Sequence, residues 1–188
     1  MTHVLQCCDL NKVAITNWHD QLLKIIYDEL KTERLITSTN QCVSYLHETD
    51  NLNNKRPDLY IENLELKRIY IIDIKSPIDA TAAFEEAIRR NLNKYDELKN
   101  RIKNHKTDYL VTIHTIVIGS LGSVPDSTIR ELRNIGVKEN RLKTIIKILQ
   151  SSNIRNSAKI WKFHQDKIYL PDERSEKKED DENSDEDE

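Results

Sequence analysis

The sequence has few of the residues that interrupt regular structure. It contains three glycines and four prolines in 188 residues, while 32% of its residues are charged. That composition is typical of one helix-rich soluble domain of ordinary size. No run approaches the roughly 18 apolar residues of a membrane span, and the N-terminus MTHVLQCCDLNK has no apolar signal-peptide core. We therefore expect a protein that is neither secreted nor bound to a membrane.

Cysteine is also scarce. Cys7, Cys8 and Cys42 make an odd count without the spacing of a disulfide framework. Such a pattern suits a reducing compartment inside the cell.

Negative charge is concentrated at the C-terminal end. The chain has a net charge of −3, but residues 172–188 hold eleven acids and three bases, a net −8, so the first 171 residues carry about +5. A segment this acidic cannot bury enough apolar surface to fold, and we predict a disordered tail over 169–188. The tail is either a solubilising end, a phosphate mimic that competes with nucleic acid for the basic face, or a handle for a basic partner.

The hydrophobic spacing of the rest predicts alternating helices and strands. Helices are predicted over 11–33, from Asp79 or Thr81 to about Lys103, and near 125–135, 138–150 and 152–165. Strands are predicted near 35–36 and 42–46, on both sides of a turn at 62–67, and over 109–119. The inward-facing residues are predicted to be Phe84, Ile88, Leu92, Tyr95, Leu98 and Ile102 in the first long helix after the hairpin, and Ile154, Ala158 and Trp161 in the last one. This order favours an α/β fold with a mixed sheet flanked by helices, whose active residues lie at one end of the central strands.

The stretch KRPDLYIENLELKRIYIIDIKSP, residues 55–77, carries the chemistry. Side chains alternate faces along a strand, so Asp73 and Lys75 point to the same side of IYIIDIK. Charges at a strand end commonly just reach water. However, Pro57 and Asp58 open a preceding strand, and a hairpin of this length brings Asp58 beside Asp73.

Two adjacent carboxylates repel each other and need a cation to stay ionised. Their hard oxygen atoms suit Mg²⁺ or Mn²⁺, and Mg²⁺ usually takes one or two carboxylates together with a substrate phosphate. Such a metal polarises the phosphoryl oxygen, and a nearby lysine stabilises developing negative charge. The combination predicts a metal-dependent nuclease.

The order α-β-β-β-α-β with PD and DIK resembles the PD-(D/E)XK nuclease superfamily. The ordered segments RPDLYI, IIDIKSP, NKYDELK, TIVIGSLGSVP, LRNIGV and ILQSSNIRNSAKIWK resemble, over roughly residues 1–165, the restriction-like endonuclease domain of site-specific non-LTR retrotransposon proteins. The resemblance implies a restriction-endonuclease-like core over 11–168, with extra C-terminal helices.

The resemblance also implies roles for individual residues. Asp58 and Asp73 match the two catalytic acids that bind the metal, and Lys75 matches the catalytic lysine of the wider superfamily. Superfamily members often add a Glu from the first helix; Glu29 is a candidate for this role, or else an exposed residue near the end of the helix.

Many retrotransposon members take their lysine from the following helix instead, one turn before a Lys-Tyr pair. In this chain that position is Asn91 and the pair is Lys94-Tyr95, so Lys94 is a secondary catalytic candidate, or else a phosphate contact or a solvated side chain. We expect Tyr95 to be a core residue. Arg90, Lys94 and Arg101 lie near one exposed line of the helix and are the predicted DNA contacts.

The N-terminal segment 1–10 resembles the second half of the zinc knuckle that precedes the nuclease in those proteins. It offers at most His3, Cys8 and Cys7, and the two upstream cysteines of a knuckle do not occur in the chain, so we expect no bound zinc. NWHDQLL resembles the start of the family's first helix, and we expect His19 to be buried and hydrogen-bonded rather than catalytic.

The implied activity is nicking of double-stranded DNA at a target site, where the free 3′ end primes reverse transcription. The expected partners are that DNA and a reverse transcriptase domain or retrotransposon ribonucleoprotein, and the expected place of action is the nucleus, reached from the cytoplasm. The alternatives are a catalytically silent DNA-binding or interaction module and a host-adopted DNA-repair nuclease.

Overall fold

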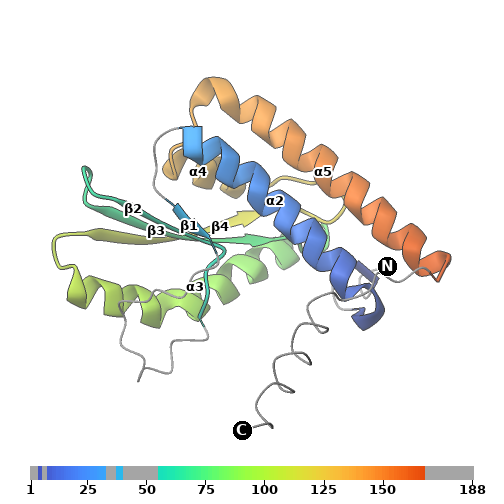
Figure 1. Cartoon of the computed structure of the whole chain (residues 1–188), viewed down its shortest axis with the longest axis horizontal. Helices are drawn as coiled ribbons and strands as arrows, with labels where there is room; N and C mark the ends of the chain where they lie inside the picture. The colour runs from blue at the N-terminus through green and yellow to red at the C-terminus, as the bar shows by residue number, and fades with distance from the viewer. Residues whose placement is uncertain (1–3, 6–7, 33–36, 40–54, 168–188) are drawn as a thin grey trace, which may run out of the picture.

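A computed structural model describes residues 4–5, 8–32, 37–39 and 55–167 of the chain (Figure 1). The elements in chain order are a 3-10 helix η1 (Asp9–Asn11), α2 (Lys12–Thr32), β1 (Thr37–Thr39), β2 (Leu59–Asn63), β3 (Arg68–Lys75), α3 (Thr81–His105), β4 (Leu110–Val117), α4 (Asp126–Asn134) and α5 (Glu139–Gln165). Among the described residues, no helix combines the length and the apolar character needed to cross a membrane.

The strands form one sheet in the order β1-β2-β3-β4. β1 pairs antiparallel with β2, β2 pairs antiparallel with β3, and β3 pairs parallel with β4. The predicted α/β class with a mixed sheet and flanking helices is therefore confirmed, while the restriction-endonuclease identity of this core stays a prediction. The predicted hairpin is also present, and its turn is closed by the Leu66 N–H, which donates to Asn63 Oδ1 over 2.8 Å.

Helices cover both faces of the sheet. Successive side chains of β3 point to opposite faces, so its apolar residues need a covering layer on each side. Tyr70, Ile72 and Ile74 belong to the larger core, beneath α2 and α5. Ile69 and Ile71 belong to a second core on the opposite face, beneath α3. In Figure 1, α2 and α5 lie side by side on one side of the sheet and α3 lies on the other. Burying each isoleucine contributes roughly 1.5–3 kcal/mol, so this pattern fixes which side of β3 carries the charged residues.

The first half of α3 differs from the predicted inward-facing stripe. Leu92 is exposed, and the buried residue of that turn is Asn91, which is 1% exposed. The Asn91 Nδ2 group donates to Thr115 Oγ1 on β4 over 2.9 Å. The prediction failed at this point because a hydrogen bond to a neighbouring strand makes a polar side chain the better fit to the sheet.

Asp79 has another role than the predicted helix cap. Ala80 precedes α3 and makes no side-chain cap. The Asp79 carboxylate instead accepts hydrogen bonds from the backbone N–H groups of Leu121, at 2.6 Å, and Ser123, at 2.9 Å. A side chain at Gly119 would collide with this carboxylate. Asp79 thus ties the loop after β4 to the start of α3.

The two helices predicted over 138–150 and 152–165 are one continuous helix, α5. Its second half is also rotated relative to the prediction, because Ile154 and Ala158 are exposed and Ser152, Asn153 and Ser157 are among the buried residues. These polar side chains are buried because hydrogen bonds satisfy them.

Asn153 is the centre of that polar contact. Its Oδ1 accepts a hydrogen bond from Trp18 Nε1 of α2 over 2.7 Å. Its Nδ2 lies 3.1 Å from Ser76 Oγ and 3.3 Å from the Ile118 carbonyl oxygen. One side chain therefore holds α2, α5 and the ends of β3 and β4 together, next to the charged end of β3.

Candidate active site

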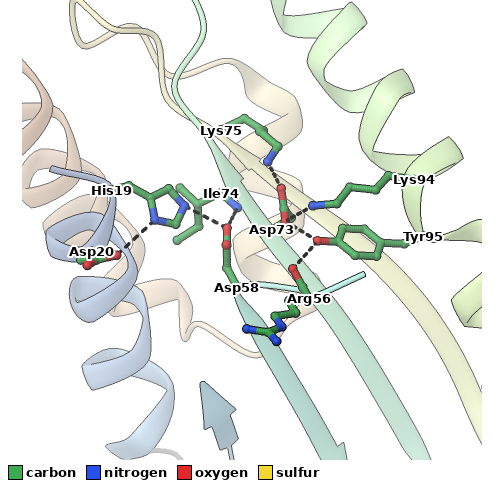
Figure 2. Close-up of polar contacts among 9 residues, drawn as sticks. All are labelled: His19, Asp20, Arg56, Asp58, Asp73, Ile74, Lys75, Lys94 and Tyr95. Carbon is green, nitrogen blue, oxygen red and sulfur yellow. Dashed lines mark hydrogen bonds and ion pairs between the residues drawn. The ribbon is translucent and has the colours of Figure 1, made fainter. Parts of the chain in front are cut away.

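The hairpin brings Asp58 and Asp73 to one end of the sheet, as predicted. Leu59 pairs with Ile72, so the next step of the antiparallel ladder places Asp58, just before β2, opposite Asp73 on β3. Figure 2 shows the two carboxylates with different partners: Asp58 turns toward α2, and Asp73 turns toward α3 and Lys75.

Asp73 is a buried carboxylate surrounded by cations and a hydroxyl. It is 1% exposed. Lys75 Nζ forms a close ion pair with its Oδ2, without hydrogen-bond geometry. Lys94 Nζ lies 3.6 Å from its Oδ1, and the Tyr95 hydroxyl donates to Oδ1 over 2.7 Å. Burial of a charge is tolerated only with such partners, so the charge of Asp73 is compensated from two elements.

Tyr95 is a core residue, as predicted, but its contact with Asp73 was missed. Its hydroxyl also lies 2.8 Å from the carbonyl oxygen of Arg56, and its single proton can serve only one of these acceptors fully at a time. Burial and the negative charge of Asp73 raise the pKa of Tyr95 far above its usual range. The phenol therefore stays neutral and acts as a donor that orients Asp73.

Asp58 is held by two donors. Its Oδ2 accepts the backbone N–H of Ile74 over 2.6 Å and His19 Nε2 over 3.1 Å. Burial alone would raise the pKa of Asp58, but the hydrogen bond and charge of His19, the Ile74 N–H and the charge of Lys75 outweigh it and lower that pKa. Asp58 is thus stabilised as a carboxylate.

His19 is the side-chain partner of Asp58, a contact that the sequence did not predict. It is hydrogen-bonded, as predicted, but 35% of its side chain is exposed, and its bond is to Asp58 itself. The hydrogen bond to Asp58 raises the pKa of His19 against the opposing effect of burial, and Asp20, 3.5 Å away, adds to the rise. The first helix therefore reaches the site through a histidine.

Although their hydrogen bonds differ, the two carboxylates share one electrostatic environment. The charge of Lys75 acts on Asp58, and the charge of Asp58 acts on Tyr95, the hydroxyl that binds Asp73. Within the described part of the chain, no three or more His, Cys, Asp or Glu side chains are grouped so as to hold a metal ion. The carboxylates that the hairpin brings to this end of the sheet are Asp58 and Asp73, and Mg²⁺ in proteins usually takes one or two carboxylates together with water or substrate oxygens.

Asn91 adds an oxygen on the same side of the sheet. It is held by Thr115, which is the β4 register partner of Asp73. Its Oδ1 is buried and has no hydrogen-bond partner among the described residues. An orphaned buried oxygen of this kind costs roughly 1–3 kcal/mol unless a water molecule satisfies it.

Glu29 does not join this group. It lies ten residues beyond His19 on α2, about 15 Å along the helix, and its carboxylate accepts two hydrogen bonds from Arg141 of α5, at 2.9 and 2.8 Å. Those hydrogen bonds lower the pKa of Glu29. The structure thus places Glu29 in a bidentate ion pair between helices, and the alternative of an exposed side chain near the end of the helix is wrong, because Glu29 is buried.

The three predicted DNA contacts follow one another along α3 but differ in their partners. Arg90 is ion-paired with Glu86, and Arg101 with Glu97 at 3.1 Å. Lys94 lies between them, 43% exposed beside Asp73 and 4.5 Å from the centre of the Tyr95 ring. Lys94 is therefore the member of the line that belongs to the candidate site.

The N-terminal segment is described only in part, since His3 and Cys7 lie outside the described residues, as do Cys42, the strands predicted near 35–36 and 42–46, and the predicted acidic tail. Val4 and Leu5 belong to the larger core. Cys8 is buried, with its Sγ 3.9 Å from His164 Nδ1 on α5. The described part of this segment therefore packs onto the same body as α2.

Comparison of the sequence with models of protein families found no match, and comparison with curated proteins found none either. The motifs and the arrangement of Asp58, Asp73, Lys75 and their partners are therefore the features that bear on function.

Proposed function

We propose that this protein is a metal-dependent DNA endonuclease that hydrolyses phosphodiester bonds. The observation that carries the proposal is Asp73, a fully buried carboxylate at the end of a central strand, with Lys75 and Lys94 beside it. Asp58 lies opposite, just before the neighbouring strand β2, and its lowered pKa keeps it ionised. Perturbed ionisable groups gathered at one end of a sheet are typical of active sites.

The residues fit a hard divalent cation by their chemistry. Asp58 and Asp73 would hold Mg²⁺ or Mn²⁺, which take oxygen ligands and leave positions for water and phosphate. The orphaned oxygen of Asn91, whose amide is held by the β4 neighbour of Asp73, is a further hydrogen-bond acceptor in this part of the sheet. When bound, the metal supplies a Lewis acid for the phosphoryl oxygen and a water of lowered pKa.

The chain's own side chains have separable tasks in this proposal. Lys75 is 37% exposed and close enough to Asp73 to stabilise negative charge that develops on a neighbouring phosphate. Lys94 contributes a second positive charge and can contact the DNA backbone. Tyr95 orients Asp73, and His19 orients Asp58.

The substrate proposed is double-stranded DNA, and phosphate contacts along α3 would position it without specifying sequence. By the resemblance in motifs, the cut is a target-site nick for insertion of a non-LTR retrotransposon. A reverse transcriptase domain or a retrotransposon ribonucleoprotein is then the partner, and the nucleus is the place of action.

The test is nicking of supercoiled plasmid with and without Mg²⁺ or Mn²⁺. Asp73→Asn keeps the shape of the side chain but removes its charge, and we expect nicking to fall by several orders of magnitude. DNA affinity, measured by gel shift, should hold or rise slightly, because a negative charge near the phosphates is lost. Asp96→Asn makes the same change on the exposed surface of α3 and should cut like the parent. Equal nicking by the parent and Asp73→Asn, at matched protein and metal, would refute the assignment.

A second candidate is a catalytically silent DNA-binding module. The observation that favours it is that two ammonium groups and a hydroxyl already compensate Asp73, as they would in a purely structural ion cluster. On this alternative no metal supports nicking, and DNA binding survives every substitution at Asp73. A host-adopted repair nuclease would nick like the first candidate, but without a reverse transcriptase partner.

A further inference from the structure

A pocket of about 300 Å³ adjoins the candidate active site. Its walls come from Leu5 of the N-terminal segment, from α2, from the end of β3 with the residues that follow it, and from α3. The apolar part of its lining includes Ile15, Trp18, Leu22, Ile74, Pro77 and Ala87. This volume is at the lower end of small-molecule sites, about 300–1,000 Å³, so the pocket suits one small ring system rather than a long chain.

Two residues of the pocket also belong to the active site. His19 and Lys75 line it, and the same side chains contact Asp58 and Asp73. A phosphate bound at Lys75 would therefore have an apolar hollow immediately beside it. An apolar peptide would gain nothing from this charge, whereas a nucleotide has an anion and a flat, weakly polar ring joined at short range.

The wall of the pocket is fixed. Trp18 Nε1 is bonded to Asn153 Oδ1 over 2.7 Å, and Asn153 in turn holds Ser76, a further lining residue. The indole is thereby locked in place, and the Ser76 hydroxyl is already engaged. Bases bind such pockets by stacking and apolar contact. Because the Ser76 hydroxyl is already hydrogen-bonded, this wall is suited to bind any base rather than one particular base.

We propose that this pocket receives a nucleobase swung out of the DNA next to the scissile phosphate. The preferred substrate is then DNA with an unpaired nucleotide at the cut, such as a bulge or a mismatch, whatever the base. This inference rests on the proposed nuclease function and adds selectivity for DNA structure to it. In a matched duplex the base must first be unpaired and unstacked, which costs free energy. That cost is much smaller for a nucleotide that is already unpaired.

The first measurement compares the full chain, with Mg²⁺, on two DNA duplexes that differ by a single bulged nucleotide. We expect the bulged DNA to be cut about tenfold faster or more. The second measurement needs no cleavage: 2-aminopurine is placed at the bulge, and its fluorescence is followed as protein is added in EDTA. Entry into the pocket should change the fluorescence in a saturable way.

The variant is Ala87→Phe, which fills the pocket from α3 without altering a residue of the active site. Ala82→Phe adds the same ring at an exposed position of the same helix and serves as the control. We expect Ala87→Phe to abolish both the preference and the fluorescence change, and Ala82→Phe to retain both. If Ala87→Phe fails to fold by circular dichroism, Ala87→Leu replaces it.

The outcomes separate the pocket from the nuclease. Equal cutting of bulged and matched DNA, with a fluorescence response that Ala87→Phe leaves intact, overturns the pocket and leaves the nuclease standing. No cutting of any DNA, with a fluorescence response that Ala87→Phe abolishes, overturns the nuclease and supports the pocket as a base-binding site. A change of oligomeric state on Ala87→Phe, seen by sedimentation without any fluorescence response in the parent, means that a second copy fills the pocket and also overturns the inference.

Discussion

The contact between His19 and Asp58 predicts a specific dependence of stability on pH. The hydrogen bond spans 3.1 Å, and it raises the pKa of His19 above its ordinary value of 6.5 while helping to lower that of Asp58 below its ordinary 3.8. His19→Gln keeps a neutral donor in the same place but can no longer gain a proton. The variant therefore isolates the charge of His19 from its hydrogen bond.

The direction in which stability changes with pH follows from the raised pKa of His19 and the lowered pKa of Asp58. A raised pKa means that the contribution of His19 is fully present below about pH 6.5 and is lost as the pH rises through its folded-state pKa. A lowered pKa means that the contribution of Asp58 is present above about pH 4 and is lost as the pH falls through its own folded-state value. Both contributions are complete between those limits, so the parent should exceed His19→Gln most at about pH 5.

The expected difference in unfolding free energy between the parent and His19→Gln is modest. A hydrogen bond to a charged group is worth about 1.5–3 kcal/mol, but 35% of the His19 side chain is exposed, and solvent screens such pairs. We therefore expect the deficit of His19→Gln to be about 1 kcal/mol larger at pH 5 than at pH 8. In a chain of this length that corresponds to roughly 2–4 °C in Tm.

The assay is urea unfolding followed by circular dichroism in EDTA, at pH 5 and pH 8. A double-mutant cycle supplies the control, because in an Asp58→Asn background His19 keeps only its weaker contact with Asp20. The deficit of His19→Gln should therefore change less between pH 5 and pH 8 there than in the parent background. A deficit that does not change between pH 5 and pH 8 in the parent background would refute the ion pair.

The remaining predictions concern the charges around Asp73 and at the end of the chain. Lys75→Ala should lower plasmid nicking about 10²-fold or more, as loss of an oxyanion donor does, and should leave metal binding measured by calorimetry mostly intact; unchanged nicking would remove Lys75 from the mechanism. Tyr95→Phe should cost about 1–3 kcal/mol of unfolding free energy, because Asp73 and the Arg56 carbonyl lose a buried donor; an unchanged urea midpoint would contradict this. Deletion of 172–188 removes a net −8 and should tighten non-specific DNA binding, with a steep loss of affinity as salt rises; salt-independent binding would rule out the electrostatic account.

The sequence predicted the hairpin and the placing of its charges because that part of the fold is local. A period of two in RIYIIDIK decides which residues face each side, and Pro57 and the polar turn decide where the strands begin and end. Asp58 and Asp73 then meet through pairing between neighbouring strands. None of these steps depends on a residue far away in the chain.

Other parts of the site depend on contacts between distant residues, and there the sequence was insufficient. Glu29 follows the helical line that suggested a catalytic role, but its partner Arg141 is 112 residues away. The contact of His19 with Asp58 likewise joins two elements whose relative position is set by tertiary packing. No local pattern distinguishes an acid that reaches the active site from one that pairs with a later helix.

The errors in α5 have the same origin. Apolar spacing selected Ile154 and Ala158 as buried, whereas the buried face carries Asn153 and Ser157, satisfied by groups at the end of β4. Periodicity measures where apolar residues fall, and it cannot detect a polar face that is buried because a loop supplies its hydrogen bonds. Asn153 on that polar face holds Trp18, which lines the pocket. The wrong prediction for α5 therefore concerned a residue that shapes the pocket.

The choice between a nuclease and a silent module depends on how Asp73 exchanges its partners. A buried carboxylate has to be compensated, so a divalent cation bound at Asp73 Oδ2 would take the place of the Lys75 ammonium. Lys75 is 37% exposed and can turn toward water, or toward a phosphate, without leaving its own charge buried. Lys94 and Tyr95 would remain beside Oδ1. On the nuclease proposal Oδ2 would thus be the oxygen of Asp73 that holds a cation, whereas on the silent-module alternative Lys75 would keep that position.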